Sequence, residues 1–170
     1  TEPALNRYGV LHEPDAEVTC DTREDEQAVV LTTSCATLTA DKKTGRVSLA
    51  GKDGGALLQN TADPQSTSEG FDLSFGLEQG EKLYGMGDVT RDRLNKHGFM
   101  KKIWVVNVGC YVPIPFLMSD KGWGLLINTT WRHYIDAGCK QEENLHIWSD
   151  GGTLDYYLFA GSSLGEILDA

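Results

Sequence analysis

Residues 71–76 read Phe-Asp-Leu-Ser-Phe-Gly and carry the clearest structural signal in the sequence. Large apolar side chains stand at Phe71, Leu73 and Phe75, and polar or small residues stand between them. Because side chains on a β-strand alternate between two faces, this period of two predicts a strand with one buried face and one face in water. The segment therefore predicts a sheet that packs one face against a core.

Short β-prone runs extend in both directions from this strand, and turn residues separate them. Residues 41–45 (Asp-Lys-Lys-Thr-Gly) have the composition of a hairpin loop, and residues 60–70 are polar throughout and predict a loop. Further strands are predicted over residues 18–23, 28–33, 36–40, 46–50, 56–58, 82–84, 103–106, 116–119, 124–128, 133–136, 145–148 and 154–159. Many short strands with glycine-containing turns at near-regular spacing predict an all-β fold, an antiparallel β-sandwich.

One helix start is predicted at the C-terminal end of the sequence. Residues 163–166 (Ser-Leu-Gly-Glu) have the spacing of a capping box, and Leu164, Ile167 and Leu168 share one helix face. A helix of about seven residues is short against the ~12–15 that an isolated helix needs. The unfinished helix predicts that residues 1–170 are cut from a longer protein, and their number is that of a single domain.

Charge and hydropathy exclude two classes of partner. The chain has 170 residues, with 15 Lys and Arg against 25 Asp and Glu and a formal charge of −10. Nucleic-acid binders need clustered basic residues, and the one basic group here, Lys96, Lys101 and Lys102, is expected on a solvated strand edge. No apolar run approaches the roughly 18–20 residues of a membrane-spanning helix, so neither nucleic acid nor membrane is an expected partner.

The cysteines predict no metal site and no disulfide framework. Cys20, Cys35, Cys110 and Cys139 form no Cys-x-x-Cys pair, and zinc sites need closer ligand spacing. Buried or semi-buried free thiols are the expectation. Together with the absence of a secretory signal pattern at the start of the sequence, free thiols favour a cytoplasmic protein.

No self-sufficient catalytic set is present in the sequence. The nucleophile-elbow, P-loop, His-Glu-x-x-His and dinucleotide-binding patterns are absent, and Gly85-Met86-Gly87 is too short for the last of these. The four histidines are scattered, and no pair of carboxylates is singled out by spacing. We therefore predict no catalytic residue, no metal and no cofactor within this chain.

Several segments together resemble one family of enzymes. Residues 82–88 (Lys-Leu-Tyr-Gly-Met-Gly-Asp) are similar to the tyrosine-glycine-x-glycine-acid segment of glycoside hydrolase family 31. The order and spacing of the matching segments agree with that family over roughly residues 69–170. The other matching segments are residues 103–107, 111–119, 120–128, 152–161 and 166–168.

The resemblance implies a fold and a parent enzyme. In that family this module is a galactose-mutarotase-like antiparallel β-sandwich, and it precedes a (β/α)8 barrel that holds the aspartate nucleophile and the aspartate acid/base of a retaining mechanism. The barrel's tryptophan-x-aspartate signature is absent from the present sequence. The resemblance thus implies an α-glucosidase-like or α-xylosidase-like parent acting on oligosaccharides or glycosides, with the barrel as this domain's partner and no activity in the domain alone.

The resemblance also implies a substrate contact. In the family a loop of this module, often tryptophan-asparagine-x-aspartate, reaches over the barrel mouth and touches sugar. The matching stretch here is Trp104-Val105-Val106-Asn107, which keeps the tryptophan and replaces the aspartate by asparagine. Because asparagine both donates and accepts hydrogen bonds and carries no charge, a substituted or different sugar is expected. Asn107 is the expected sugar-reading residue, with Trp104 and Tyr111 as platform residues beside it.

Two other functions remain open at this stage. A free-standing carbohydrate-binding module could use Trp123, Trp131 or Trp148 as an aromatic platform. A mutarotase-like enzyme needs a placed histidine and glutamate, and no motif in the sequence supplies them. The sequence also leaves open the sugar, the linkage and whether the protein forms homo-oligomers.

Overall fold

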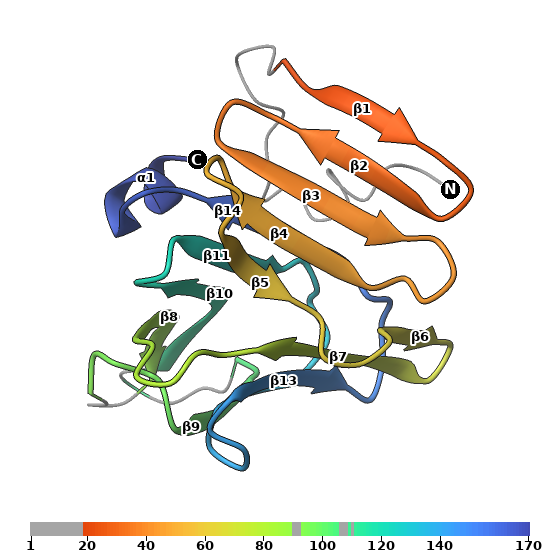
Figure 1. The fold of residues 1–170 in the computed structure, drawn as a ribbon. Helices are drawn as coiled ribbons and strands as arrows, with labels where there is room; N and C mark the ends of the chain where they lie inside the picture. Colours follow the sequence, from red (N-terminus) through yellow and green to blue (C-terminus); the bar gives the residue numbers. More distant parts are fainter. Residues whose placement is uncertain (1–18, 90–92, 106–108, 110) are drawn as a thin grey trace.

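The computed structural model describes residues 19–89, 93–105, 109 and 111–170 (Figure 1). Within these residues, fourteen strands form three antiparallel sheets, and one short helix, α1 (Leu164–Asp169), follows them. The prediction of an all-β fold is confirmed. Asn107 and Cys110 lie outside the described residues. No helix in the described part of the chain is long and apolar enough to cross a membrane.

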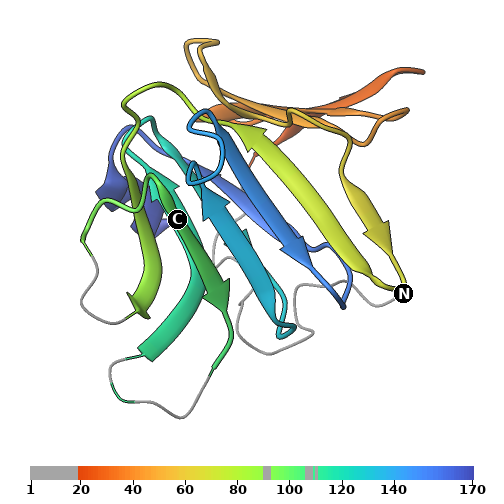
Figure 2. The ribbon, with the colours of Figure 1, turned by 90° about the horizontal axis from the view of Figure 1, so that it is seen from below.

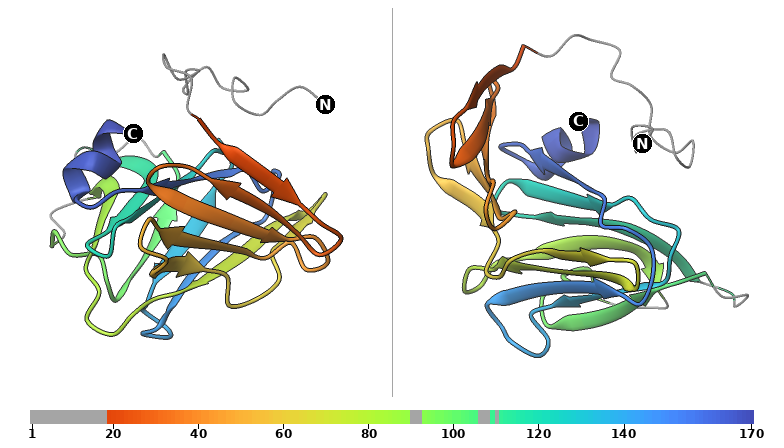
Figure 3. Two further views of the ribbon diagram at one scale, coloured as in Figure 1. Left: turned by 45° about the horizontal axis from the view of Figure 1, so that its top comes forward. Right: turned by 90° about the vertical axis from the view of Figure 1, so that its right-hand side faces the viewer.

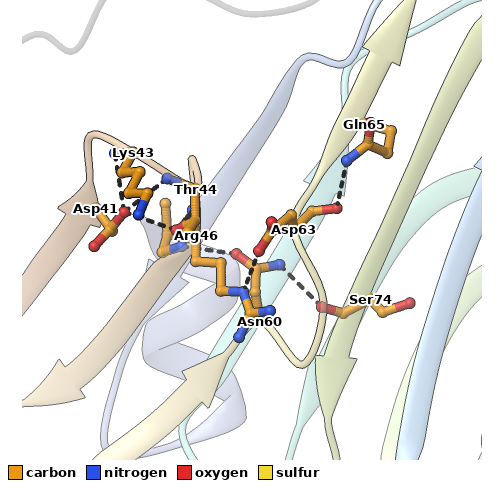
Figure 4. A network of polar contacts seen from close by, with 9 residues as sticks. Asp41, Lys43, Thr44, Arg46, Asn60, Asp63, Gln65 and Ser74 are labelled. Atoms are coloured by element: carbon orange, nitrogen blue, oxygen red, sulfur yellow. Dashed lines mark hydrogen bonds and ion pairs between the residues drawn. The ribbon is translucent and has the colours of Figure 1, made fainter.

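The first sheet is a meander of consecutive hairpins. Its strands are β1 (Asp21–Glu24), β2 (Ala28–Thr32), β3 (Ala36–Asp41), β4 (Val47–Gly51) and β5 (Ala56–Gln59). The predicted loop between β3 and β4 is present, because the Asp41 carboxylate accepts hydrogen bonds from the Thr44 amide (2.7 Å), the Thr44 hydroxyl (2.8 Å) and the Lys43 amide (3.0 Å) (Figure 4). These bonds, led by the Thr44 amide, lower the pKa of Asp41.

The other two sheets form the sandwich that holds the core (Figure 3). One has the order β6 (Gln65–Thr67), β7 (Gly70–Gly76), β13 (Asn144–Ser149), β12 (His133–Ala137), β9 (Phe99–Ile103). The other has the order β14 (Tyr156–Ala160), β11 (Trp123–Ile127), β10 (Tyr111–Ser119), β8 (Leu83–Val89). Figure 2 shows the strands of the two sheets from below, with the first sheet along one side.

The two faces of β7 differ in burial as predicted. Phe71, Leu73 and Phe75 are buried, and Asp72 between them is exposed. The core around them comes from both sheets of the sandwich, and its largest fully buried members include Leu83, Leu117, Trp123, Leu125, Ile127, Ile135, Leu145 and Ile147. Burial of this apolar surface is the main stabilising contribution to the fold.

A buried asparagine joins the first sheet to the sandwich. Asn60 follows β5; its Oδ1 accepts from the Val47 amide at 2.7 Å, and its Nδ2 donates to the Ser74 carbonyl at 2.9 Å (Figure 4). Val47 begins β4 and Ser74 lies within β7, so one side chain bonds the backbones of two sheets. Beside it, the exposed pair Arg46–Asp63 (2.6 Å) bridges the turn before β4 to the loop after β5.

Several strand predictions differ from the structure in their limits. The strand predicted over residues 82–84 extends to Val89, and the one predicted over residues 116–119 starts at Tyr111. Two further differences share one cause. The strand predicted over residues 103–106 ends at Ile103 and starts at Phe99, because the backbone of Phe99–Ile103 pairs with β12. The polar loop predicted over residues 60–70 contains β6, whose three exposed residues pair with the start of β7. In both places backbone pairing with another strand, the adjacent β7 for β6 and the more distant β12 for β9, decides the element, and the side-chain pattern does not show it.

Two expectations about single residues are wrong. Lys96 was expected on a solvated edge together with Lys101 and Lys102, and instead it is only 6% exposed. Its backbone explains the burial, since the Lys96 amide donates to the Leu83 carbonyl at 2.7 Å and pulls the segment against β8. The cysteines were expected to be buried, but Cys20, Cys35 and Cys139 are free and exposed.

The predicted helix start is present with a variation in its cap. Ser163 is the N-cap, and its hydroxyl accepts from the Glu166 amide at 3.2 Å. The Glu166 carboxylate accepts from the amide and the hydroxyl of Ser162, both at 2.8 Å, rather than from the amide of Ser163. The Ser162 amide bond is the main cause of the lowered pKa of Glu166. Ile167 is buried, and α1 packs against β10 and β14.

Candidate functional site

Two exposed tryptophans border a groove at one edge of the sandwich. Trp104 directly follows β9 and is 43% exposed; Trp131, in the loop before β12, is 56% exposed. They meet because β9 and β12 pair with Ile103 opposite His133. The hollow, which we call the tryptophan groove, has a volume of about 330 Å³. It is lined by Ile103, Trp104, Val105, Pro113, Pro115, Thr129, Thr130, Trp131 and His133.

The Trp131 indole lies directly on a glycine pair. A Cβ atom built on Gly151 would lie 2.4 Å from the ring, and one built on Gly152 would lie 2.5 Å from it. Only glycine lets the ring approach the backbone this closely. The indole is therefore held flat against the turn before β14 while more than half of its residue surface stays exposed. An aromatic surface supported in this way suits stacking with a flat, partly apolar ligand.

A buried histidine forms part of the floor of the groove. His133 is only 1% exposed, and its Nδ1 lies 2.9 Å from the Trp131 carbonyl oxygen, which makes Nδ1 the protonated nitrogen. The Nε2 atom is enclosed and has no hydrogen-bond partner among the described residues. Burial lowers the pKa of His133, and the hydrogen bond to Trp131 opposes that shift. The ring is thus held neutral, with an unpaired acceptor.

Tyr111 does not line the tryptophan groove. It begins β10, and its hydroxyl donates to the Lys102 carbonyl at 2.5 Å. That bond ties the start of β10 to β9 and occupies the hydroxyl. Of the three substrate-contact residues expected from sequence, Trp104 lies in the groove, Tyr111 lies beside β9, and Asn107 falls outside the described residues.

The three tryptophans considered as carbohydrate platforms have different environments. Trp123 is fully buried in the core. Trp148 is half-buried and stacks with two neighbouring rings, Tyr134 (5.1 Å between centroids) and His146 (4.7 Å). Trp131 alone of the three is exposed and faces a groove. No pattern in the sequence indicated this platform, because the glycine pair Gly151-Gly152 lies about twenty residues from Trp131 along the chain.

The described residues that line the groove are aromatic, apolar or hydroxyl-bearing, apart from His133. None of them is an aspartate or glutamate, the residue types that a glycosidase pair needs. In the described part of the chain, no group of three or more His, Cys, Asp or Glu side chains is placed to hold a metal ion. Its indoles and threonine hydroxyls fit a neutral ligand with both apolar and hydroxyl surfaces.

The sequence profile of the glycosyl hydrolase 31 N-terminal galactose mutarotase-like domain matches residues 2–136. The chain belongs to this family. The fold and the resemblance expected from sequence are thereby confirmed. Two curated relatives are similar to the chain. They are the α-xylosidase XylQ of Lactiplantibacillus pentosus, 26% identical over 130 residues (68% of this chain and 17% of the relative), and α-glucosidase 2 of Bacillus thermoamyloliquefaciens, 25% identical over 176 residues (94% and 22%).

Solved structures of the family share the fold of this glycosyl hydrolase 31 domain. A dextranase from Flavobacterium johnsoniae, solved with isomaltotriose, superposes with a TM-score of 0.76 at 20% identity and covers 89% of this chain and 20% of its own. An α-xylosidase from a soil metagenome, solved with xylose, gives a TM-score of 0.74 at 18% identity over 92% of this chain and 28% of its own. The chain therefore spans about a fifth of the length of the curated relatives it matches.

Proposed function

We propose that the chain is the non-catalytic N-terminal domain of a retaining, exo-acting α-glycosidase with α-glucosidase-like or α-xylosidase-like specificity. In this proposal the domain supports a C-terminal (β/α)8 barrel and lends residues 104–107 to the sugar pocket. The barrel's carboxylates carry out hydrolysis, so the domain alone is inactive. The observation that carries the proposal is the exposed Trp104 directly after β9, in a segment that matches the family's sugar-contacting loop.

The surroundings of Trp104 support a binding role. Among its described lining residues the groove beside it has two indoles and no carboxylate, which suits contact with a sugar ring and is consistent with chemistry in another part of the protein. Relatives named α-xylosidase and α-glucosidase suggest α-xylosides and α-glucosides as the substrate class. Tyr111 stays a proposed platform residue of the sugar pocket outside the groove, with its hydroxyl held by the Lys102 carbonyl.

Asn107 is the proposed specificity residue of this loop. An aspartate at this place would only accept hydrogen bonds and would add negative charge near a developing oxocarbenium ion. Asparagine donates as well as accepts and adds no charge. We therefore propose that Asn107 reads a hydroxyl or substituent that the usual α-glucoside pocket does not select.

The test uses Asn107→Asp and Asn107→Ala in the full-length parent enzyme. We expect Asn107→Ala to lower kcat/KM on the preferred sugar by about tenfold or more, which is roughly 1.4 kcal/mol of transition-state stabilisation. Asn107→Asp should shift the preference toward unsubstituted α-glucosides. Met100→Ala, an exposed change on β9, is the matched control. Unchanged kcat/KM for both variants on every α-xyloside, α-glucoside and substituted glycoside tested would refute the assignment.

A free-standing carbohydrate-binding module is the second candidate, and the Trp131 platform favours it. Calorimetry of the 170-residue chain with maltose, xylose and galactosides tests it. Binding tighter than millimolar that Trp131→Ala abolishes and Trp148→Ala preserves would support this second function. Absence of binding to all three sugars would contradict it.

A further inference from the structure

A second cleft lies away from the tryptophan groove, between β8, β10 and α1. Its volume is about 470 Å³. Three exposed apolar side chains from three parts of the chain stand around it, namely Leu94, Ile114 and Leu168 of α1. Its lining residues are Gly85, Met86, Gly87, Asp88, Leu94, Lys96, Ile114, Phe116, Met118 and Leu168. We call it the Lys96 cleft.

Lys96 is a largely buried side chain whose ammonium group has no partner among the described residues. The residue is 6% exposed, and no hydrogen bond or ion pair joins its ammonium group to residues 19–89, 93–105, 109 or 111–170. The nitrogen is not among the fully enclosed unpaired atoms of the described residues, so the buried stem delivers the ammonium to the cleft surface. Taking a charged group out of water is costly unless an opposite charge meets it.

Among the described residues that line the cleft, the one acidic residue is not paired with Lys96. Asp88 is exposed, and no ion pair within 4.0 Å joins it to Lys96 among the described residues. The remaining lining residues are glycine or apolar. Within the part of the chain that the structure describes, the cleft therefore offers one ammonium group without a carboxylate partner, beside apolar walls, which is complementary to a carboxylate carried between apolar side chains.

We propose that the Lys96 cleft docks an acidic side chain from the catalytic part of the parent enzyme, flanked there by apolar residues. This inference rests on the proposed function, since it requires the chain to be part of a longer glycosidase. The positive charge of Lys96 favours a carboxylate as the occupant of the cleft. The exposed apolar side chains around the cleft favour a protein surface over a small soluble anion. The relatives are about five times longer than the region matched, and Leu168 places α1 at the cleft, so a chain continuing beyond α1 leaves the domain beside it.

The first experiment is zero-length cross-linking of the full-length parent with a carbodiimide, followed by peptide mass spectrometry. We expect an amide between the Lys96 nitrogen and an aspartate or glutamate located after residue 170. A link from Lys96 to Asp88 or Asp92 would overturn the proposal. Labelling of Lys96 by an acylating reagent as fast as labelling of exposed Lys102 would also overturn it, because a docked ammonium is protected.

A second experiment compares one substitution in two contexts. In the isolated 170-residue chain, Lys96→Met removes an ammonium group that has no ion-pair partner among the described residues, and the melting temperature should stay constant or rise. In the parent the same change leaves the docked carboxylate of the catalytic part without its ammonium partner, and the melting temperature should fall by several degrees. Lys102→Met is the control and should change neither. A shift of the same sign and size in both contexts would overturn the proposal.

The proposed function is tested separately in the same parent preparation by hydrolysis of chromogenic α-xylosides and α-glucosides. A parent that forms the Lys96 cross-link but hydrolyses neither substrate would refute the glycosidase assignment and support the docking site. A parent that hydrolyses these substrates but leaves Lys96 freely labelled would support the glycosidase assignment and refute the docking site.

Discussion

The indole nitrogen of Trp123 donates a hydrogen bond of 2.7 Å to Oε1 of Glu81, and both residues are almost completely buried. The same oxygen accepts from the Ser119 hydroxyl, and Oε2 accepts from the Glu78 amide at 2.7 Å. A carboxylate from the turn before β8 thus receives donors from the end of β10 and the start of β11. Trp123 is consequently a structural residue that anchors a buried charge, and it offers no surface to a sugar.

Glu81→Gln should destabilise the domain, because every partner of this side chain is a donor. A glutamine must turn its NH₂ group toward either the Glu78 amide or the Trp123 and Ser119 donors. One buried polar group is then unsatisfied, which costs about 1–3 kcal/mol. Guanidinium denaturation measures the loss. Glu78→Gln removes only the exposed ion pair with Lys121 and should cost less than about 1 kcal/mol. Equal losses for the two variants would contradict this account.

Gly87→Ala should be among the most damaging single substitutions in the chain. Gly87 has a φ of +74°, and an added Cβ would lie 1.9 Å from the Val112 carbonyl oxygen. The close approach comes from the irregular pairing of β8 with β10, where the register shifts between Pro113 and Leu117. We expect a loss of roughly 3 kcal/mol or more in the free energy of unfolding.

Gly54→Ala measures the part of such a loss in unfolding free energy that comes from the backbone conformation alone. Gly54 has a φ of +82°, but nothing lies within 4 Å of an added Cβ. Its loss should be limited to about 1–2 kcal/mol, the cost of the left-handed conformation. If the two alanine variants unfold with the same free energy, steric contact with β10 is not what requires glycine at position 87.

Much of the fold could be predicted from local patterns. The alternation in residues 71–76, the loop closed by Asp41 and the cap at Ser163 are each decided by residues close in sequence, and each is present in the structure. The limits of β6 and β9 could not be predicted, because pairing with the backbones of β7 and β12 decides them.

The candidate site was predicted only in part, because contacts between separate segments of the chain also decide its geometry. Family resemblance indicated Trp104. The support of Trp131 by Gly151 and Gly152 depends on contacts between residues about twenty positions apart, and no local pattern predicts it. Lysine is usually a surface residue, and the burial of Lys96 follows from a backbone hydrogen bond to Leu83.

Asn60→Asp should weaken the junction between the first sheet and the sandwich. Aspartate keeps the acceptor for the Val47 amide but loses the donor to the Ser74 carbonyl, and it places a carboxylate oxygen against that carbonyl (Figure 4). Because Asn60 is buried, we expect a loss of about 1–3 kcal/mol by urea denaturation. Thr61→Ala removes an exposed hydroxyl bond to Asn144 and should cost no more than about 0.5 kcal/mol. A smaller loss for Asn60→Asp than for Thr61→Ala would rule out this junction.

His133 should make the domain less stable as the pH falls below neutrality. Burial lowers its pKa in the folded state, whereas in the unfolded chain the pKa is about 6.5. Above that value the imidazole is neutral in both states and its contribution is constant. As the pH falls through it, the unfolded chain gains a proton that the folded state does not, and stability declines by up to about 1.4 kcal/mol per pH unit. The decline from this group ends at the folded-state pKa.

Urea denaturation at pH 7.5, 6.5 and 5.5 separates this contribution from that of the carboxylates. Asp25, Asp41 and Glu166 have lowered pKa values, so their stabilising contribution is lost only as the pH falls below about 4, the range of unperturbed carboxyl groups. His133→Asn should be less stable at pH 7.5 and should show a shallower decline toward pH 5.5. Tyr134→Phe, a neighbouring change on β12 without a group that titrates in this range, should keep the wild-type slope. If His133→Asn declines as steeply as the wild-type chain, another group is responsible for the pH dependence.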